Sequence, residues 1–161
     1  MRVGFGFDAH RLEVGRKFVL GGVTIPFDRG PLGHSDGDVL AHALSDALLG
    51  ACAIGDLGML FPSSEEQWRD ADSLGMLALC MKMARDEGYA LENVDATVVV
   101  ERPVLAPFIP LIRERLAEVL EISSADLSVK AKTTDGMGYT GDGTGIAAYA
   151  VVLVQEVGEE G

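Results

Sequence analysis

Three histidines and the aspartates near them are the residues of this sequence best suited to do chemistry. Asp8 and His10 stand two apart in FDAH, and His34 and His42 lie within the segment GHSDGDVLAH. On a strand, residues two apart point to the same face, so Asp8 and His10 can converge on one ion. His42 would add a third ligand from a helix. One carboxylate and two imidazoles match a catalytic zinc site, which keeps its fourth position open for substrate.

The same three residues also have an ordinary structural interpretation. Asp8 and His10 could simply end a strand, and His42 could be a partly exposed helix residue, because a D-x-H sequence is common. The chain has only three histidines, however, and all of them lie in two short motifs that also contain aspartate. Histidines scattered over a protein surface would not be expected to cluster in this way. We therefore favour the hypothesis that these residues bind a metal ion.

The residues just before this helix suggest a phosphate site. Backbone N–H groups at a helix N-terminus and the Ser35 hydroxyl could receive a phosphate oxygen, and His34 could donate a hydrogen bond to it. Alternatively, Ser35 only caps the helix, since Ser35 followed by Asp38 resembles a capping box; the two roles can coexist. Asp38, His42 and Asp46 are spaced by four, so either aspartate could orient the His42 ring or could merely be solvated.

A glycine-rich segment, KAKTTDGMGYTGDGTG, forms a third constellation. Lys132, Thr133 and Thr134 offer an ammonium group and hydroxyls beside closely approaching backbone, which suits a phosphate. Asp135 suits a magnesium ion that keeps most of its waters. A glycine-rich connection between strands can also be no more than a turn.

The elements that must position these residues follow from the spacing of apolar residues. Recurrence at three and four predicts helices over residues 36–52, 73–87 and 107–121. β-Branched and aromatic runs predict strands in RVGFGFDAH, KFVLGGVTIPF, ENVDATVVVERP, LSVKAKTT and GIAAYAVVLVQEV. The segments IGDLGMLFPSSEE and DGMGYTGDGTG are expected to be loops. Strands at both ends with helices between them indicate a single α+β domain over residues 1–161, with a mixed sheet covered by helices on one face.

Composition excludes several classes of function. A net charge of −12 argues against nucleic acid, which is held mainly by lysine and arginine. The longest apolar run, AAYAVVLV, is far shorter than the about 20 residues that cross a bilayer, so we expect a cytoplasmic protein without a membrane partner. Cys52 and Cys80 lie in apolar helical patterns and are expected to be reduced core residues. A phosphorylated ligand would need positive charge that metal ions could supply.

Taken together, these segments resemble the 2-C-methyl-D-erythritol 2,4-cyclodiphosphate synthase family of non-mevalonate isoprenoid biosynthesis. The resemblance is carried by GFGFDAHRL, LGGVTIP, HSDGDVLAHALSDALLGACAIGDLGMLFP, ADS, NVDATVVVERP and VKAKTTDGMGYTGDGTGIAA, in that order. It implies a homotrimer with active sites between neighbouring subunits. It also implies a phosphorus–oxygen lyase whose substrate, 4-diphosphocytidyl-2-C-methyl-D-erythritol 2-phosphate, closes into the cyclodiphosphate and releases CMP.

The resemblance also implies roles for individual residues. Zinc would be bound by Asp8, His10 and His42, and magnesium, or manganese in its place, by Asp135. His34 and Thr133 would orient and stabilise the transferring phosphates as catalytic residues. The substrate-binding residues would be Ser35, Asp56, Leu57, Gly58, Phe61, Pro62, Ser63, Ser64, Glu65, Lys132, Thr134, Tyr139 and Asp142. The nucleotide pocket would be formed by Val100, Glu101, Arg102, Pro103, Val104, Leu105 and Ala106.

Three places depart from the family pattern. Asp135 stands where the family usually has glutamate, and FPSSE replaces an aspartate-rich loop. Asp142 and Thr144 replace an arginine and a glutamate that the family associates with an isoprenoid diphosphate in the central trimer cavity. We therefore expect such a ligand to bind poorly here.

Two other functions are compatible with a zinc site. In a noncatalytic zinc-binding trimer, the metal would only lock the strand to the helix. In a zinc phosphohydrolase, water would occupy the open position and attack the phosphate.

Overall fold

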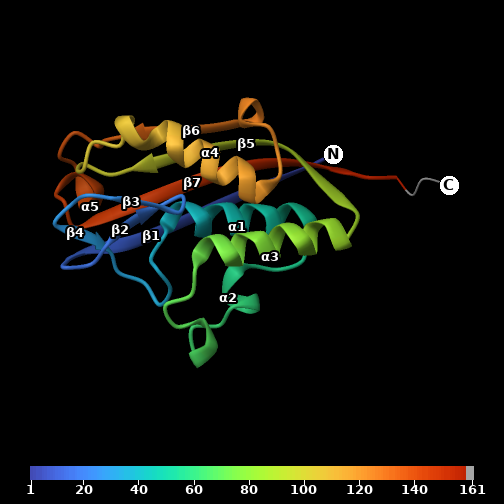
Figure 1. Cartoon of the computed structure of the whole chain (residues 1–161), viewed down its shortest axis with the longest axis horizontal. Helices are drawn as coiled ribbons and strands as arrows, with labels where there is room; N and C mark the ends of the chain where they lie inside the picture. Colours follow the sequence, from blue (N-terminus) through green and yellow to red (C-terminus); the bar gives the residue numbers. More distant parts are fainter. Residues whose placement is uncertain (159–161) are drawn as a thin grey trace.

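A five-stranded mixed sheet runs the length of the structure (Figure 1). The computed structural model describes residues 1–158. The strand order is β4-β1-β7-β5-β6, and only the β5–β6 pair is parallel. These strands span β1 Arg2–Val14, β4 Arg29–Pro31, β5 Tyr89–Val99, β6 Leu127–Lys132 and β7 Gly145–Glu156.

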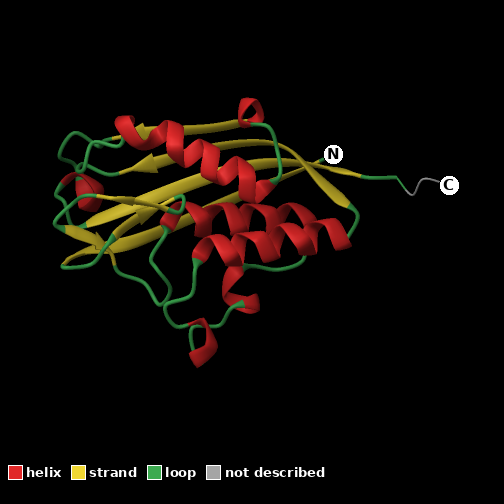
Figure 2. Cartoon of the chain, in the orientation of Figure 1, coloured by secondary structure: helices red, strands yellow, loops and turns green. Residues whose placement is uncertain are grey.

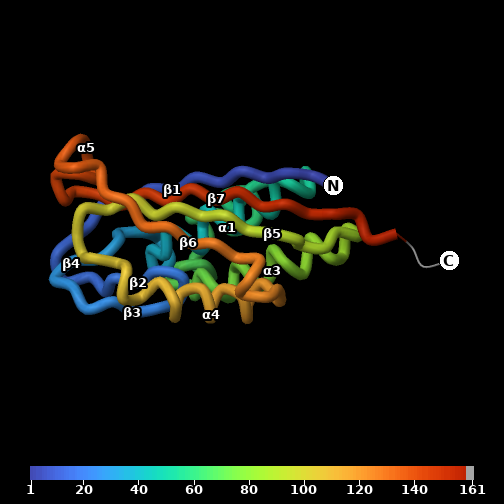
Figure 3. The backbone as a smooth tube through the Cα atoms, turned by 90° about the horizontal axis from the view of Figure 1, so that it is seen from above, coloured from blue at the N-terminus to red at the C-terminus, as the bar shows by residue number. Residues whose placement is uncertain are grey.

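Three long helices cover one face of this sheet (Figure 2). They are α1 Val39–Cys52, α3 Ser73–Asp86 and α4 Ile109–Leu120. Turned by 90°, the chain shows β1 and β7 along one side and α3 and α4 along the other (Figure 3). The expected α+β class, with a mixed sheet and helices on one face, is confirmed.

The packing of α1 on β1 depends on two glycines. A Cβ atom added to Gly4 would lie 1.9 Å from the carbonyl oxygen of Ala47, and one added to Gly6 would lie 1.8 Å from that of Ala43. Only glycine permits so close an approach of strand and helix. The small side chains of α1 therefore lie directly on the strand that carries Asp8 and His10.

The start of α1 differs from the sequence-based prediction. The helix begins at Val39 rather than at residue 36, and its N-cap is Asp38, whose side chain accepts a hydrogen bond from Ala41 N at 3.1 Å. Ser35 is therefore not the cap, and the predicted capping box was wrong. Asp38, rather than Ser35, caps the helix because its carboxylate is also held in place by hydrogen bonds from Gly21 N and Gly22 N at 3.0 and 2.8 Å.

Gly21 and Gly22 also form a turn within KFVLGGVTIPF, so the prediction of one strand there was wrong. The segment is a hairpin of β2 Phe18–Leu20 and β3 Val23–Ile25, not one strand. Gly21 and Gly22 both have positive φ, which the two-residue turn between such strands favours.

The remaining elements lie close to their predicted positions. The helix expected over 73–87 ends at Asp86, and Pro110 lies in the first turn of α4, where it costs no helical hydrogen bond. Cys52 and Cys80 are buried free thiols, as expected. The expected loops contain two short helical turns, α2 Leu57–Leu60 and α5 Gly138–Gly141, and the 3₁₀ turn η1 Glu66–Trp68 begins at the last residue of the first loop. Two further 3₁₀ turns are η2 Ala106–Phe108 and η3 Ser124–Asp126.

Over β1 and β7, the sheet face away from the helices is apolar and exposed. We call it the open sheet face, and it comprises Val3, Phe5 and Phe7 of β1 with Tyr149 and Val151 of β7. A contiguous apolar surface of this kind is typical of an interface. Among the described residues, no helix is both long enough and apolar enough to cross a bilayer.

Candidate functional site

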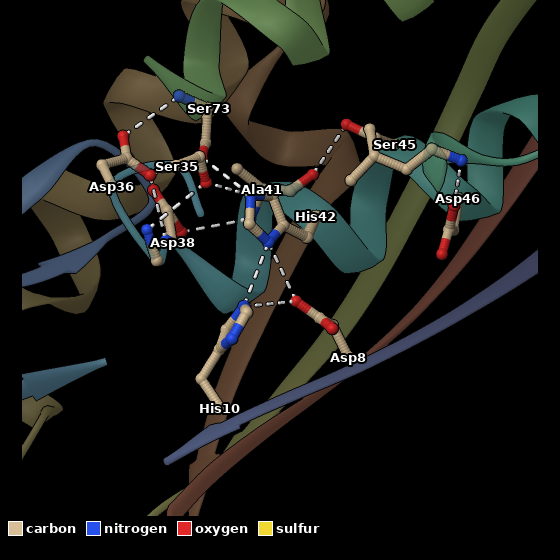
Figure 4. Close-up of polar contacts among 12 residues, drawn as sticks. Asp8, His10, Ser35, Asp36, Asp38, Ala41, His42, Ser45, Asp46 and Ser73 are labelled. Atoms are coloured by element: carbon tan, nitrogen blue, oxygen red, sulfur yellow. Dashed lines mark hydrogen bonds and ion pairs between the residues drawn. The ribbon is translucent and has the colours of Figure 1, made fainter. Parts of the chain in front are cut away.

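Asp8, His10 and His42 come together where β1 meets the first turn of α1 (Figure 4). Asp8 Oδ2 lies 2.8 Å from His10 Nε2 and 2.9 Å from His42 Nδ1. The two imidazole nitrogens are 3.1 Å apart. His42 is buried, so its interpretation as a partly exposed helix residue was wrong.

These contacts change the acid–base behaviour of the cluster. Burial by itself would raise the pKa of Asp8, but hydrogen bonds from His10 and His42 outweigh burial and lower that pKa from 3.8 to about 2. Burial would likewise lower the pKa of His42, but the hydrogen bond and charge of Asp8 outweigh burial and raise it. Asp8 therefore stays ionised at neutral pH, as a metal ligand must.

The three donor atoms fit a metal ion by distance and by chemistry. Ligands about 2.0–2.2 Å from a tetrahedral metal lie about 3.3 Å from one another. The observed separations of 2.8 to 3.1 Å are slightly shorter, which is a small adjustment for side chains. Asp8, His10 and His42 could therefore hold a metal ion, with one side left open to a cavity.

The far side of the His42 ring faces two serines. His42 Nε2 lies 2.9 Å from Ser35 Oγ and 2.9 Å from Ser73 Oγ. Asp38 and Asp46, which the spacing of four suggested for this role, are both engaged elsewhere. Asp46 accepts a hydrogen bond from Leu57 N at 2.7 Å, and Asp38 caps α1, so that prediction was wrong.

Of the two serines at this side of the ring, sequence reasoning named Ser35 but missed Ser73, and it missed Asp36 behind Ser73. Ser73 comes from the start of α3, 31 residues beyond His42, and Asp36 contacts Ser73 through both its hydroxyl and its backbone N–H. No local pattern links these segments. The only available signal was that Ser73 lies in ADS, one of the matching motifs.

A cavity of about 350 Å³ opens beside the triad formed by Asp8, His10 and His42. It brings His34 and Ser35 together with much of the predicted substrate loop. The lining residues are His10, His34, Ser35, His42, Leu57, Gly58, Phe61, Pro62, Ser63, Ser64, Trp68 and Met76. We call this the triad cavity.

Two predicted residues of that loop do not line the triad cavity, and two others were missed. Asp56 caps α2 by accepting a hydrogen bond from Met59 N, and Glu65 accepts one from the Trp68 indole N–H at 3.1 Å. Trp68 and Met76, which were not predicted, do line the cavity. Trp68 packs edge-on against Phe61, with ring centroids 4.7 Å apart.

The predicted nucleotide segment forms a second cavity of about 200 Å³. Its lining residues are Val100, Glu101, Pro103, Val104, Leu105, Ala106, Ala131, Lys132 and Thr133. We call this the segment cavity. Arg102 does not line it and faces a separate cavity with Asp142. The segment cavity and the triad cavity share no lining residue.

The glycine-rich segment divides between several environments. Thr133 Oγ1 donates a hydrogen bond to the exposed carboxylate of Asp135 at 3.1 Å. Thr134 Oγ1 instead donates to Met137 O at 2.6 Å, which ties the loop to itself. Tyr139 is half exposed and lies in a small cavity beside His10.

Asp142 is held by a neighbour in the same loop. Its Oδ1 atom accepts hydrogen bonds from Thr144 N at 2.9 Å and from Thr144 Oγ1 at 2.7 Å. These bonds lower the pKa of Asp142, so the exposed carboxylate is fully ionised at neutral pH.

Comparison with known proteins adds a second line of information. The model of the YgbB family matches residues 1–155. A 2-C-methyl-D-erythritol 2,4-cyclodiphosphate synthase of Geotalea daltonii is 54% identical over 155 residues, covering 96% of this chain and 91% of that relative. The enzyme of the same name from Moorella thermoacetica is 54% identical over 154 residues, covering 96% and 94%.

Solved structures agree with this relationship. A 2C-methyl-D-erythritol-2,4-cyclodiphosphate synthase with bound CDP has a TM-score of 0.89 and 36% identity, covering 96% of this chain and 100% of that chain. The bifunctional IspDF from Campylobacter jejuni has a TM-score of 0.93 and 35% identity, covering 96% of this chain. This chain spans only 42% of that bifunctional protein.

Proposed function

This chain belongs to the YgbB family of 2-C-methyl-D-erythritol 2,4-cyclodiphosphate synthases, and from that membership we propose the reaction it catalyses. The substrate is 4-diphosphocytidyl-2-C-methyl-D-erythritol 2-phosphate. An oxygen of the 2-phosphate bonds to the β-phosphorus, and the bond from that phosphorus to the bridging oxygen of CMP breaks. An eight-membered cyclodiphosphate forms and CMP leaves, which makes the enzyme a phosphorus–oxygen lyase. The observation that carries this proposal is the Asp8, His10 and His42 cluster at the edge of the triad cavity.

Two metal ions belong to the proposal. Asp8, His10 and His42 would hold zinc, and Asp135 would hold magnesium or manganese. Magnesium usually binds through one or two carboxylates plus substrate phosphates, so a single exposed carboxylate suits it. When bound, the ions polarise the phosphates and offset their charge, which an acidic protein of net charge −12 would otherwise repel.

The side chains would mainly orient the substrate and exclude water. An intramolecular displacement needs no protein nucleophile, only reacting atoms held in line. His34, on the wall of the triad cavity, would donate a hydrogen bond to the transferring phosphate. Leu57, Gly58 and Phe61 would cover the erythritol portion and keep water out.

The cytidine portion would occupy the segment cavity. Backbone groups between Val100 and Ala106 would read the base edge, and the relative with bound CDP supports a cytidine nucleotide as ligand. Lys132 would place its ammonium group near the phosphates. Thr133 would turn its hydroxyl from Asp135 to a phosphate oxygen.

A homotrimer would bring the two cavities together. The triad cavity and the segment cavity have no residue in common, so each would be completed by a neighbouring subunit. The open sheet face supplies an apolar surface for this association, and its burial would stabilise the trimer. Sedimentation equilibrium would give the mass of the assembly.

The direct test is to incubate the purified protein with the cytidylyl substrate, zinc and magnesium and to follow CMP by chromatography. CMP and cyclodiphosphate should appear together, and His42→Ala should produce neither. Oxygen from labelled water in the product phosphate would instead indicate a phosphohydrolase. A protein that binds zinc but releases no CMP would be the noncatalytic trimer.

A further inference from the structure

A chain of hydrogen bonds leads away from the Asp8, His10 and His42 cluster through the buried side of His42 (Figure 4). His42 Nε2 lies 2.9 Å from Ser73 Oγ, and Ser73 Oγ contacts Asp36 Oδ1. Ser73 is fully buried at the start of α3, so no bulk water competes for its hydroxyl. The proposed function assigns no role to Asp36 or Ser73.

The direction of these hydrogen bonds is set by Asp36. Its Oδ1 atom accepts from Asp38 N at 3.0 Å, and its Oδ2 atom accepts from Ser73 N at 3.0 Å. A carboxylate can only accept hydrogen bonds, so the hydroxyl of Ser73 must be the donor in its hydrogen bond to Asp36. The lone pairs of Ser73 Oγ then remain for His42.

The ring of His42 must therefore carry a proton on Nε2. Without a metal, Nδ1 donates a hydrogen bond to Asp8 Oδ2. In the neutral ring that a metal would bind, a proton held on Nε2 leaves the lone pair of Nδ1 for the ion. Nδ1 is the nitrogen that faces the other two ligands, at 2.9 Å from Asp8 Oδ2 and 3.1 Å from His10 Nε2. We propose that Asp36 and Ser73 are positioning residues that select the tautomer of His42 able to bind the metal, an inference that rests on the proposed metal role of His42.

Ser35 does not provide the same direction. Its hydroxyl lies 2.9 Å from His42 Nε2, but its other contacts are Ser73 Oγ at 3.2 Å and Gly37 N at 3.4 Å. None of these partners obliges Ser35 to accept rather than donate toward the ring. Without Ser73, the remaining serine could hydrogen bond to either tautomer.

Zinc affinity of three variants tests the inference, measured by competition with a chromophoric chelator. Ser73→Ala should weaken binding by about 10- to 100-fold, the usual effect of losing such a supporting hydrogen bond. Ser73→Thr, which keeps the hydroxyl, should bind zinc more tightly than Ser73→Ala. Ser45→Ala is the matched control, because Ser45 is a buried serine of α1, the helix that carries His42, and its hydroxyl donates to Ala41 O at 2.8 Å rather than contacting the ring. An unchanged affinity in Ser73→Ala, or an equal loss in Ser45→Ala, would overturn the inference.

A spectroscopic measurement separates tautomer selection from simple packing. Long-range ¹H–¹⁵N spectra of zinc-loaded wild type should show a proton on His42 Nε2 that exchanges slowly, and assignment is simple with three histidines in the chain. Ser73→Ala should make that proton exchange faster and shift. An unprotonated Nε2 in wild type, or the same signal in Ser73→Ala, contradicts the inference without affecting the synthase assignment. Wild-type protein that binds no zinc would remove the proposed metal chemistry and this inference together.

Discussion

Gly6 lies so close beneath Ala43 that a Cβ atom at residue 6 would sit 1.8 Å from the Ala43 carbonyl oxygen. Ala43 is the residue after His42, so this contact sets how near His42 comes to Asp8 on the same strand as Gly6. The distance between α1 and β1 therefore also determines how closely Asp8, His10 and His42 approach one another.

We expect Gly6→Ala to destabilise the protein and to weaken zinc binding, because α1 must move away from β1. Overpacking of this kind costs about 1–3 kcal/mol of the free energy of unfolding. Urea unfolding at a fixed subunit concentration measures the loss. Gly50→Ala is the control, since a Cβ atom there meets nothing within 4 Å, and alanine in a helix should be neutral or stabilising by about 0.5–1 kcal/mol. Equal stability of Gly6→Ala and wild type would contradict this account of the packing.

His34 and His42 should respond differently to alanine. His42→Ala removes a ligand, so we expect less than one zinc per subunit and no detectable CMP release. His34 lies outside the cluster of donor atoms, so His34→Ala should keep its zinc yet lose about 100-fold or more in turnover, as when one phosphate-stabilising donor is removed. Metal content by mass spectrometry and CMP release check both variants. Zinc loss in His34→Ala would show that the ligand set is incorrect.

The buried thiol of Cys80 should make stability depend on pH in alkaline solution. Burial raises the pKa of Cys80 from 9.0 to about 11, so the folded protein keeps the proton that the unfolded chain releases. The contribution is present in full below pH 9 and is lost as the pH rises to about 11, amounting to about 3 kcal/mol. Urea unfolding across this range should show a steeper decline in wild type than in Cys80→Ala. Parallel curves for the two proteins would refute the prediction.

Asp142 and Thr144 should make the central cavity of a trimer a poor site for an isoprenoid diphosphate. The ionised Asp142 carboxylate repels the diphosphate, and its hydrogen bonds to Thr144 stabilise that charge. Calorimetry with farnesyl diphosphate should show weak binding, and the combined Asp142→Arg and Thr144→Glu variant should bind at least about tenfold more tightly. Tight binding by wild type would disprove the prediction.

The convergence of Asp8, His10 and His42 was predictable because its geometry is largely local. Alternation along β1 places Asp8 and His10 on one face whatever the rest of the chain does. His42 needed only one further step, since the helix that carries it follows in the same half of the sequence and packs on that strand.

The partners of His42 were not predictable in the same way. A spacing of four places Asp38 and Asp46 along the helix near His42, but it does not show which other segments compete for their carboxylates. Asp38 is taken by the turn at Gly21 and Gly22, and Asp46 by Leu57 N. Such long-range competition is decided by tertiary packing, which the period of a helix does not contain.

Trp68 has a practical consequence for future work. It is the only tryptophan in the sequence, it packs against Phe61, and it lines the triad cavity. Its fluorescence therefore arises from a single place, at the wall where substrate would enter. Changes in emission on adding a ligand would report occupancy of that cavity without any attached label.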